Sequence, residues 1–128
     1  MAVAAVTFDR PDDVSTLLDS LAAQSANITS VALVDSGKTP VQDIAEASPA
    51  PVTYVRSNTN LGGAGGFSLA MLTAMVSGAD WIWIMDDDAH PEDPNCLAAL
   101  LEAAQEHRMD VVLPLVVAPG HPDALSFH

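Results

Sequence analysis

Short apolar runs alternate with segments of helical periodicity along this chain, and this alternation limits its fold more than any other feature. Four of the five runs are largely continuous in apolar residues. Such runs are typical of strands covered on both faces, because a half-exposed strand alternates apolar and polar residues. The expected strands span residues 2–8, 30–36, 51–57, 80–86 and 110–117. We therefore predict an α/β fold, with an open, mainly parallel, doubly wound sheet and flanking helices.

The segments between the runs place apolar residues at helical spacing. Three stripes follow the i, i+3, i+4, i+7 pattern: Val14, Leu17, Leu18 and Leu21; Phe67, Ala70, Met71 and Ala74; Leu97, Leu100, Leu101 and Ala104. Pro11 and Pro94 stand where a first helical turn begins, and Asp93 is the expected N-cap of the last helix. Because 128 residues with 49% hydrophobic side chains bury one ordinary core, we predict a single domain over residues 1–128.

Charge and composition exclude several classes of protein. The formal net charge is -13, and only four residues are basic: Arg10, Lys38, Arg56 and Arg108. A nucleic-acid backbone or an anionic membrane would therefore find almost no attraction. The single cysteine, Cys96, excludes an internal disulfide, and the first residues lack the features of a signal peptide. No apolar run approaches the ~18 residues of a membrane span. We expect a cytoplasmic protein without a transmembrane segment or a nucleic-acid partner.

Four glycines within five positions follow the third expected strand, in "NTNLGGAGGF" (58–67). The dinucleotide fingerprint fails, because Ser68 stands where its last glycine is needed, and a phosphate loop fails because Lys38 is the only lysine. Glycines at a helix start let backbone N–H groups approach a ligand closely. The alternative is a tight turn in which the glycines merely let the helix pack on the sheet. Four together, at the edge where parallel sheets bind ligands, favour function.

Three consecutive aspartates follow the fourth expected strand, in "WIWIMDDDAHP" (81–91). In an extended segment, Asp86 and Asp88 point to one side and Asp87 to the other. Two carboxylates on one side repel, and Mg²⁺ or Mn²⁺ relieves that repulsion with oxygen ligands alone. Such a cation would also supply the positive charge that a diphosphate ligand needs in so acidic a protein. The alternative is a solvated acidic turn.

These motifs together resemble family 2 glycosyltransferases of the GT-A fold. The resemblance rests on "TFDRPDD", "VALVDSG", "NLGGAGGF" and "GADWIWIMDDDAHPED", and the last two most resemble galactofuranosyltransferases that build cell-wall galactan in mycolic-acid bacteria. It implies a UDP-galactofuranose donor, a lipid-linked glycan acceptor, and a location on the cytoplasmic face of the membrane. It also implies that residues 1–128 form the nucleotide-binding half of such an enzyme.

The resemblance assigns roles to individual residues. Those expected at the donor are Thr7, Arg10, Asp35, Asn60, Gly62, Gly63, Asp86 and Asp87, and those expected at the metal are Asp86 and Asp88. By this assignment Asp35 accepts the N3–H of uracil, a hydrogen bond that neutral cytosine cannot offer. Alternatives remain for three residues. Thr7 would be a strand end, Arg10 an ion-pair partner of nearby acids, and Asp35 a turn-forming residue.

Family members continue well beyond this length with an acceptor-side half, which carries the catalytic base and a metal-binding histidine. No residue of this chain is assigned as the base, and His90, His121 and His128 do not occupy the matching place. We therefore expect a truncated enzyme that does not transfer sugar by itself. Truncation would also expose apolar surface that drives self-association.

Three alternatives stay open at this stage. The donor could be another nucleotide sugar such as dTDP-rhamnose. A phosphatase of the haloacid-dehalogenase type also places D-x-D after an apolar strand, but usually the first strand, with Thr or Val where this chain has His90. A non-catalytic module that binds a nucleotide or a partner without turnover is the third.

Overall fold

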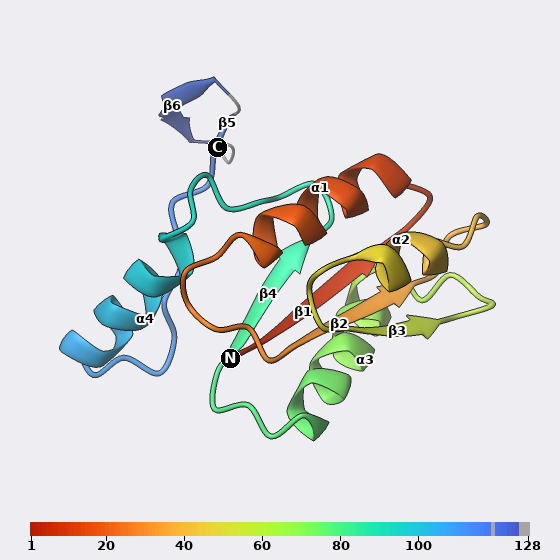
Figure 1. The fold of residues 1–128 in the computed structure, drawn as a ribbon, viewed down its shortest axis with the longest axis horizontal. Helices are drawn as coiled ribbons and strands as arrows, with labels where there is room; N and C mark the ends of the chain where they lie inside the picture. The colour runs from red at the N-terminus through yellow and green to blue at the C-terminus, as the bar shows by residue number, and fades with distance from the viewer. Residues whose placement is uncertain (119, 126–128) are drawn as a thin grey trace.

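A four-stranded parallel sheet forms the centre of the protein. The computed structural model describes residues 1–118 and 120–125. The strands are β1 (Ala2–Thr7), β2 (Ser30–Asp35), β3 (Val52–Arg56) and β4 (Ile82–Asp86), in the order β3-β2-β1-β4. All three strand pairs are parallel, so the carboxyl ends of the strands lie together at one end of the sheet. This end is called the carboxyl edge. This arrangement confirms the predicted α/β class (Figure 1).

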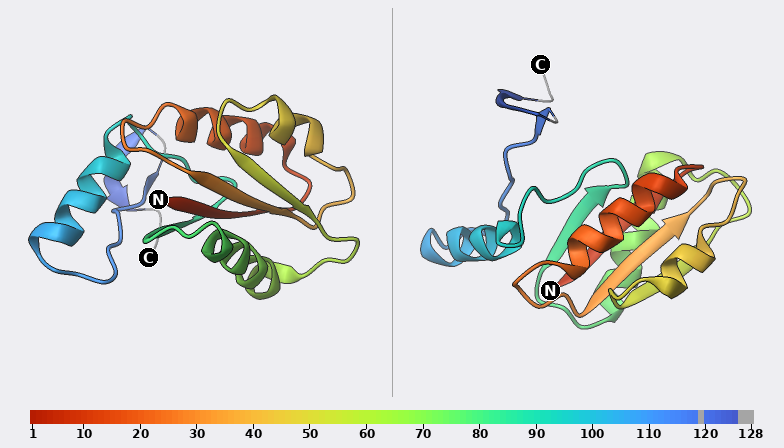
Figure 2. Two further views of the ribbon diagram at one scale, coloured as in Figure 1. Left: turned by 60° about the horizontal axis from the view of Figure 1, so that its bottom comes forward. Right: turned by 45° about the horizontal axis from the view of Figure 1, so that its top comes forward.

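Helices cover both faces of the sheet, as a doubly wound fold requires. The helices are α1 (Pro11–Ala22), α2 (Gln42–Ala47), α3 (Gly62–Val76) and α4 (Cys96–Glu106). Figure 2 shows α1 and α2 on one face of the sheet and α3 on the other. The buried core on the first face includes Leu17, Leu33 and Leu97, and the core on the second includes Ala32, Ala70 and Ala74. Among the described residues, no helix combines the length and apolar character needed to cross a membrane.

Small residues bring α3 close to the sheet. Ala2 and Ala4 of β1 face Ala70 and Ala74 in one buried cluster. A Cβ added to Gly66 would lie 3.0 Å from Cγ1 of Val6, so this position is packed too tightly for a larger side chain. The buried face of α3 is Gly66, Ala70 and Ala74, while the expected members Phe67 and Met71 are only partly buried.

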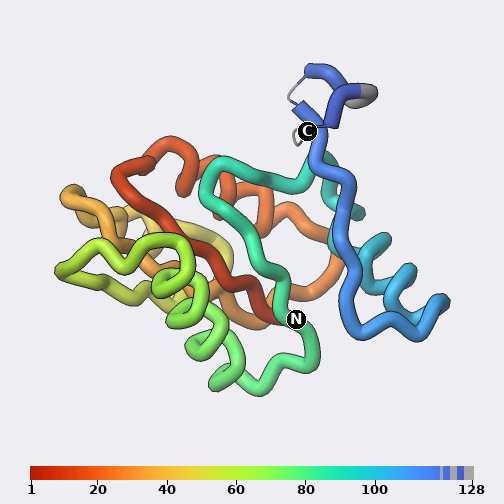
Figure 3. The backbone as a smooth tube through the Cα atoms, turned by 180° about the vertical axis from the view of Figure 1, so that it is seen from behind, coloured from red at the N-terminus to blue at the C-terminus, as the bar shows by residue number. Residues whose placement is uncertain are grey.

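The prediction of a fifth strand at 110–117 is wrong. Residues 111–116 belong to no helix or strand, and β5 (Val117–Ala118) pairs antiparallel with β6 (His121–Leu125) in a separate two-stranded sheet. Figure 3 shows this part of the chain running apart from the main sheet. The run is apolar, but Leu113 is 84% exposed and Leu115 82%. Pro114 lacks the N–H that a central strand must donate, which removes one ladder bond from the run.

The helix boundaries also refine the sequence predictions. Pro11 is the first residue of α1, as predicted. Asp93 does not cap α4: the helix begins at Cys96 after the N-cap Asn95, and Asp93 Oδ1 instead accepts from the Asn95 N–H at 2.6 Å. The Asp93 side chain thus closes a turn before the helix, a common use of a short acidic side chain.

Candidate functional site

The last residues of the four parallel strands carry much of the chemistry of the chain. They are Thr7, Asp35, Arg56 and Asp86. Because the strands are parallel, the loops that follow them lie along the same edge of the sheet, where open α/β sheets bind ligands. The loop residues Arg10, Asn60, Gly62, Gly63, Asp87 and Asp88 belong to this edge as well.

Arg10 contacts two of the three aspartates after β4. Its Nη1 donates to Asp87 Oδ1 at 3.0 Å and to Asp88 Oδ2 at 2.6 Å. The Asp87 side chain is 7% exposed and that of Asp88 57%. The sequence alternative paired Arg10 with acids near it in the chain. The structure instead pairs it with acids about eighty positions away. Arg10 therefore links the loop after β1 to the loop after β4.

The three carboxylates do not alternate as an extended strand would require. The strand ends at Asp86, and Ala89 N–H donates back to the Asp86 carbonyl at 3.3 Å, which makes a turn. Asp87 and Asp88 consequently share one guanidinium instead of pointing to opposite sides. The period-2 argument was wrong beyond Asp86, because it holds only for extended backbone.

Asp86 differs from its two neighbours in its surroundings. Burial raises the pKa of the Asp86 carboxyl, and the nearby charges of Asp88 and Asp87 raise it further, against an opposing effect of Arg10. Such repulsion among acids is relieved by a proton or by a cation. This carboxylate is therefore suited to a ligand that brings positive charge.

The donor set fits Mg²⁺ or Mn²⁺ in one specific mode. Within residues 1–118 and 120–125, no three His, Cys, Asp or Glu side chains are gathered for metal binding. A cage made by protein alone is therefore absent from this part of the chain. Mg²⁺ is commonly held by one or two carboxylates together with substrate phosphates and water. Asp86 and Asp88 supply carboxylates of that kind.

Asp35 is fully buried, and its carboxylate is bonded to protein groups. Oδ1 accepts from Gly37 N–H at 2.8 Å and lies 2.8 Å from Arg56 Nη1, while Oδ2 accepts from Val41 N–H at 3.1 Å and Tyr54 Oη at 2.7 Å. A carboxylate has about four acceptor positions, and each of them has a protein donor here. The bond to Gly37 is the turn-forming contact of the sequence alternative. That Asp35 accepts the N3–H of uracil stays a prediction. It requires one of these four donors to leave the carboxylate.

Thr7 is 4% exposed, and its hydroxyl has no hydrogen-bond partner among the described residues. Buried polar groups without a partner are uncommon in folded proteins. Thr7 pairs in register with Asp35, at the carboxyl end of β1. A polar atom of a ligand or a water molecule would satisfy this hydroxyl, which is consistent with its predicted place at the donor.

The glycine loop divides into residues with different physical roles. Gly62 has a φ of 61°, a value that favours glycine, and its N–H donates to Asn60 Oδ1 at 2.8 Å. A Cβ on Gly63 would meet no atom within 4 Å, so packing does not explain that glycine. Gly66 faces the sheet and is explained by packing alone. Gly62 and Gly63 begin α3, and the first N–H groups of a helix favour an anion, but that of Gly62 is already bonded to Asn60.

Sequence reasoning missed the contacts that hold the first two loops together. Asp9 Oδ1 accepts from Lys38 N–H at 2.6 Å and Thr39 N–H at 3.0 Å. These backbone hydrogen bonds, led by that of Thr39, lower the pKa of Asp9. Tyr54 and Arg56 were not predicted as site residues either. The available signal for Arg56 was its place at the end of an expected strand in a chain with four basic residues.

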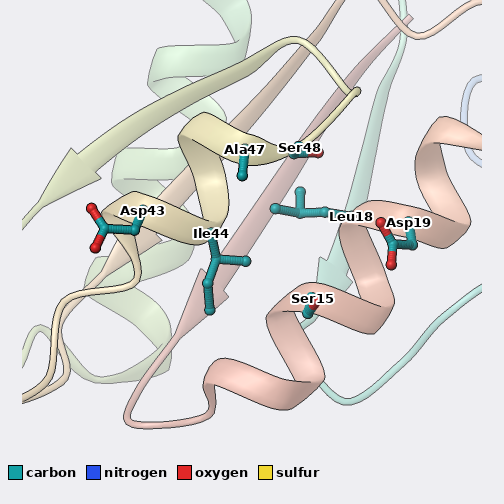
Figure 4. Close-up of a pocket in the computed structure, with 7 residues that line it drawn as sticks. All are labelled: Ser15, Leu18, Asp19, Asp43, Ile44, Ala47 and Ser48. Carbon is teal, nitrogen blue, oxygen red and sulfur yellow. The ribbon is translucent and has the colours of Figure 1, made fainter.

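A shallow pocket lies away from this edge. Between α1 and α2 a hollow of about 310 Å³ is lined by Ser15, Leu18, Asp19, Asp43, Ile44, Ala47 and Ser48. Figure 4 shows that Leu18 of α1 and Ile44 and Ala47 of α2 border the space between the two helices. It contains no convergent set of polar groups like that at the sheet edge, so we do not assign a ligand to it.

Comparison with known proteins identifies the family. The profile described as "Glycosyl transferase family 2" matches residues 2–126. The chain belongs to glycosyl transferase family 2. The galactofuranosyltransferase GlfT1 of Mycobacterium tuberculosis is 42% identical over 125 residues, and that of Mycolicibacterium smegmatis is 41% identical over 123. Each match covers 95% of this chain and 41% of the relative, so the chain spans about two fifths of the length of these relatives.

Solved structures in the same family of folds agree with the architecture. S. aureus TarS 1-349 in complex with UDP superposes with a TM-score of 0.75 at 23% identity, covering 93% of this chain and 36% of that one. The same protein in complex with UDP-GlcNAc gives a TM-score of 0.73 at 22% identity, covering 93% and 35%. At this identity the likeness shows the fold, which is that predicted from the sequence.

Proposed function

We propose that these residues form the donor-binding part of a glycosyltransferase that uses a UDP-sugar. The observation that carries the proposal is the set of groups at the carboxyl edge of the sheet. Three aspartates with Arg10, the unpartnered Thr7 hydroxyl and the glycine start of α3 lie there in a member of family 2. A nucleoside diphosphate needs hydrogen-bond donors for its phosphates and a counter-charge, and this edge is suited to supply both.

A divalent cation, Mn²⁺ or Mg²⁺, completes the proposed site. Asp86 and Asp88 would hold it, and the cation would neutralise the diphosphate that leaves in the transfer. In this structure Oδ2 of Asp88 is bonded to Arg10, and we propose that the cation displaces Arg10 from it. Arg10 would then be available to the nucleotide, and Asp87, which is buried, would keep the loop in place.

The proposed donor sugar is galactofuranose. The support is the name of the relatives, galactofuranosyltransferase, at 41–42% identity over nearly the whole chain. A lipid-linked glycan is the matching acceptor, which would place the protein at the cytoplasmic face of the membrane. A different donor such as dTDP-rhamnose remains the alternative, since the matched region covers only 41% of each relative.

We further propose that the catalytic base lies outside these residues. A base must stand within about 2.6–3.2 Å of the acceptor hydroxyl. Asp9, Asp35 and Asp87 are bonded to loop N–H groups or to arginine, and Asp86 and Asp88 are assigned to the cation. A haloacid-dehalogenase phosphatase is the less favoured alternative, because its D-x-D usually follows the first strand and here the aspartates follow β4. A binding module without turnover stays the alternative for residues 1–128 alone.

Calorimetric titration tests the proposal. We expect UDP to bind the 128-residue chain in the presence of Mn²⁺ and to bind at least about tenfold more weakly with a chelator. Asp86→Asn should lose this metal dependence, while Asp80→Asn, a change on the loop before β4, should keep it. Equal UDP affinity with and without Mn²⁺ would contradict the metal, and no UDP binding in either condition would contradict the donor site. Hydrolysis of small phosphate esters would instead indicate a phosphatase.

A further inference from the structure

Arg56 is a basic residue for which the sequence analysis assigned no role. The structure places it at the end of β3, directly against the last residue of β2. Its Nη1 lies 2.8 Å from Asp35 Oδ1, and its Nη2 donates to the carbonyl of Gly37. One guanidinium thus bonds both the Asp35 side chain and the backbone of the turn that follows it. A planar fork of donors suits such bridging, which a single ammonium group does not reproduce.

Tyr54 supplies a second donor from the same strand. Its hydroxyl donates to Asp35 Oδ2 at 2.7 Å. Burial raises the pKa of Tyr54 to about 12, and the bond to Asp35 contributes in the same direction. The hydroxyl therefore stays protonated near neutral pH and remains a donor. Together with Gly37 N–H and Val41 N–H, the two β3 side chains fix a carboxylate that is 0% exposed.

The turn held by Arg56 is also bonded to the loop after β1. Asp9 Oδ1 accepts from Lys38 N–H and Thr39 N–H. Gly37 is pressed against this loop, since an added Cβ would lie 2.5 Å from Asp9 N. Arg10 follows Asp9 and reaches the aspartates after β4. A continuous series of contacts consequently runs from β3 across the edge to the proposed metal site.

We propose that Arg56 is a positioning residue for recognition of the nucleotide base, acting through Asp35 and the turn at 36–39. This inference rests on the proposed function, in which a UDP-sugar binds at this edge. Arg56 is the ion-pair partner that the structure gives to Asp35. Without it, the buried Asp35 carboxylate loses its ion-pair partner, and the turn loses its bond to β3. Base recognition is then a property of Arg56, Asp35 and Gly37 as a unit, and not of Asp35 alone.

The first test compares UDP and CDP affinities in the presence of Mn²⁺ for the wild-type chain, Arg56→Gln and Arg108→Gln. Arg108→Gln is the matched control, because it removes the same charge from an exposed position beyond α4. We expect the wild type to prefer UDP. Arg56→Gln should weaken UDP about tenfold, the value of one strong hydrogen-bonded contact, and bring the UDP-to-CDP preference close to one. Arg108→Gln should leave both affinities unchanged.

The two failures are distinguishable. A wild-type chain that binds UDP no better than CDP overturns the prediction that Asp35 reads the base, and the role of Arg56 with it, but leaves UDP-sugar binding in the proposed function intact. A wild-type preference that Arg56→Gln retains overturns the role of Arg56 alone. Parallel losses for UDP and CDP would show that Arg56 supports the site generally without acting on the base, which also overturns the inference.

A double-mutant cycle tests whether Arg56 acts through Asp35. In an Asp35→Asn background, Arg56→Gln should change the UDP-to-CDP preference no further, since the shared contact is already lost. Additive effects of the two substitutions would show that they act independently and would overturn the proposal.

A second variant covers failure of Arg56→Gln to fold. Arg56→Lys keeps the charge but cannot bond Asp35 and the Gly37 carbonyl in the same planar geometry. We expect it to melt within a few degrees of the wild type and to lose most of the UDP preference. A full wild-type preference in Arg56→Lys would show that charge alone suffices, and would contradict the bridging role.

Discussion

The negative charges of Asp86, Asp87 and Asp88 lie close together at the carboxyl edge of the sheet. Arg10 neutralises part of this charge by bonding the second and third aspartates, and it is only half buried. The first aspartate has the raised pKa. This division of charge leads to two predictions. One concerns the Arg10 guanidinium, and the other concerns the Asp86 carboxylate.

Arg10→Gln should strengthen the binding of Mn²⁺ in the absence of nucleotide. The guanidinium and the cation compete for Asp88. Removing the guanidinium leaves Asp88 to the cation and should tighten Mn²⁺ binding by a factor of about two to five, as for a largely exposed pair. Electron paramagnetic resonance of free Mn²⁺ during titration measures the affinity directly. Arg108→Gln controls for the general effect of one lost positive charge. Unchanged or weaker Mn²⁺ binding in Arg10→Gln would show that Arg10 and the metal do not share Asp88.

Asp86→Asn should raise the melting temperature near neutral pH without metal. The pKa of Asp86 is raised in the folded state, so the folded protein holds this proton more tightly than the unfolded chain. Stability contributed by this group is therefore present at low pH and is lost as the pH rises through the raised pKa. The advantage of Asp86→Asn should accordingly vanish below about pH 4, under the ordinary aspartate pKa.

Added Mn²⁺ should reverse that order, because the wild type binds the cation and the variant does not. Thermal melts between about pH 4 and pH 8, with and without Mn²⁺, measure both effects. Asp80→Asn serves as the matched control. A variant that melts below the wild type at neutral pH without metal would contradict the unfavourable charge at Asp86.

At the scale of elements, the two glycines at the start of α3 have different roles. Gly62 is required by its backbone conformation, and Gly63 is assigned to the proposed donor site. Gly62 has positive φ, while Gly63 has ordinary helical backbone with open space around its missing Cβ. The same substitution at neighbouring positions should consequently act in opposite directions. Packing gives no reason for glycine at 63, which is consistent with its proposed place at the donor.

Gly62→Ala should destabilise the fold by about 1 kcal/mol, because an L-residue at positive φ is strained. Gly63→Ala should stabilise it by about 0.5 kcal/mol, since alanine favours helix over glycine. Urea denaturation measures both. Gly63→Ala should nevertheless bind UDP more weakly, because the methyl group hinders close approach to the backbone. If Gly63→Ala were more stable and bound UDP with wild-type affinity, the assignment of Gly63 to the donor site would be wrong.

At the scale of the whole molecule, apolar side chains lack cover on β4 and on α3, in addition to the exposed run at residues 109–116. β4 is the last strand of the sheet and exposes 51% of Ile84, because α3 lies mainly over β1 and β2. The outer side of α3 exposes Leu72, Met75 and Val76. A helix that is apolar on all sides is typical of buried positions, so α3 is suited to packing on both sides.

Residues 1–128 alone should self-associate through the β4 edge, increasingly at high salt. Each copy carries a net charge of -13, which opposes association at low ionic strength and is screened over about 3 Å at 1 M salt. Light scattering after size-exclusion chromatography measures the mass. Ile84→Glu should keep the protein monomeric, whereas Thr53→Glu, on the other edge strand, should not. A wild-type chain that stays monomeric at high salt would contradict this prediction.

The sequence by itself determined the layers of the fold and the edge where its polar residues gather. Continuous apolar runs predict strands that are covered on both faces, and apolar residues at helical spacing predict the helices that cover them. Both patterns follow from local backbone geometry. Such patterns say nothing about which partner a strand finds. For that reason residues 110–117 looked like a fifth strand, and only the structure showed that residues 111–116 belong to no strand.

The contacts among distant charges were decided by tertiary structure alone. Arg10 could have paired with any of several acids near it in sequence, and the fold places it on Asp87 and Asp88. Asp35 was placed at the end of its strand correctly, yet its burial and its bonds to Tyr54 and Arg56 depend on β3 lying beside β2. The strand order is set by long-range packing and not by local spacing. The sequence therefore determined which residues stand at the edge, and the tertiary structure determined which of them bind one another.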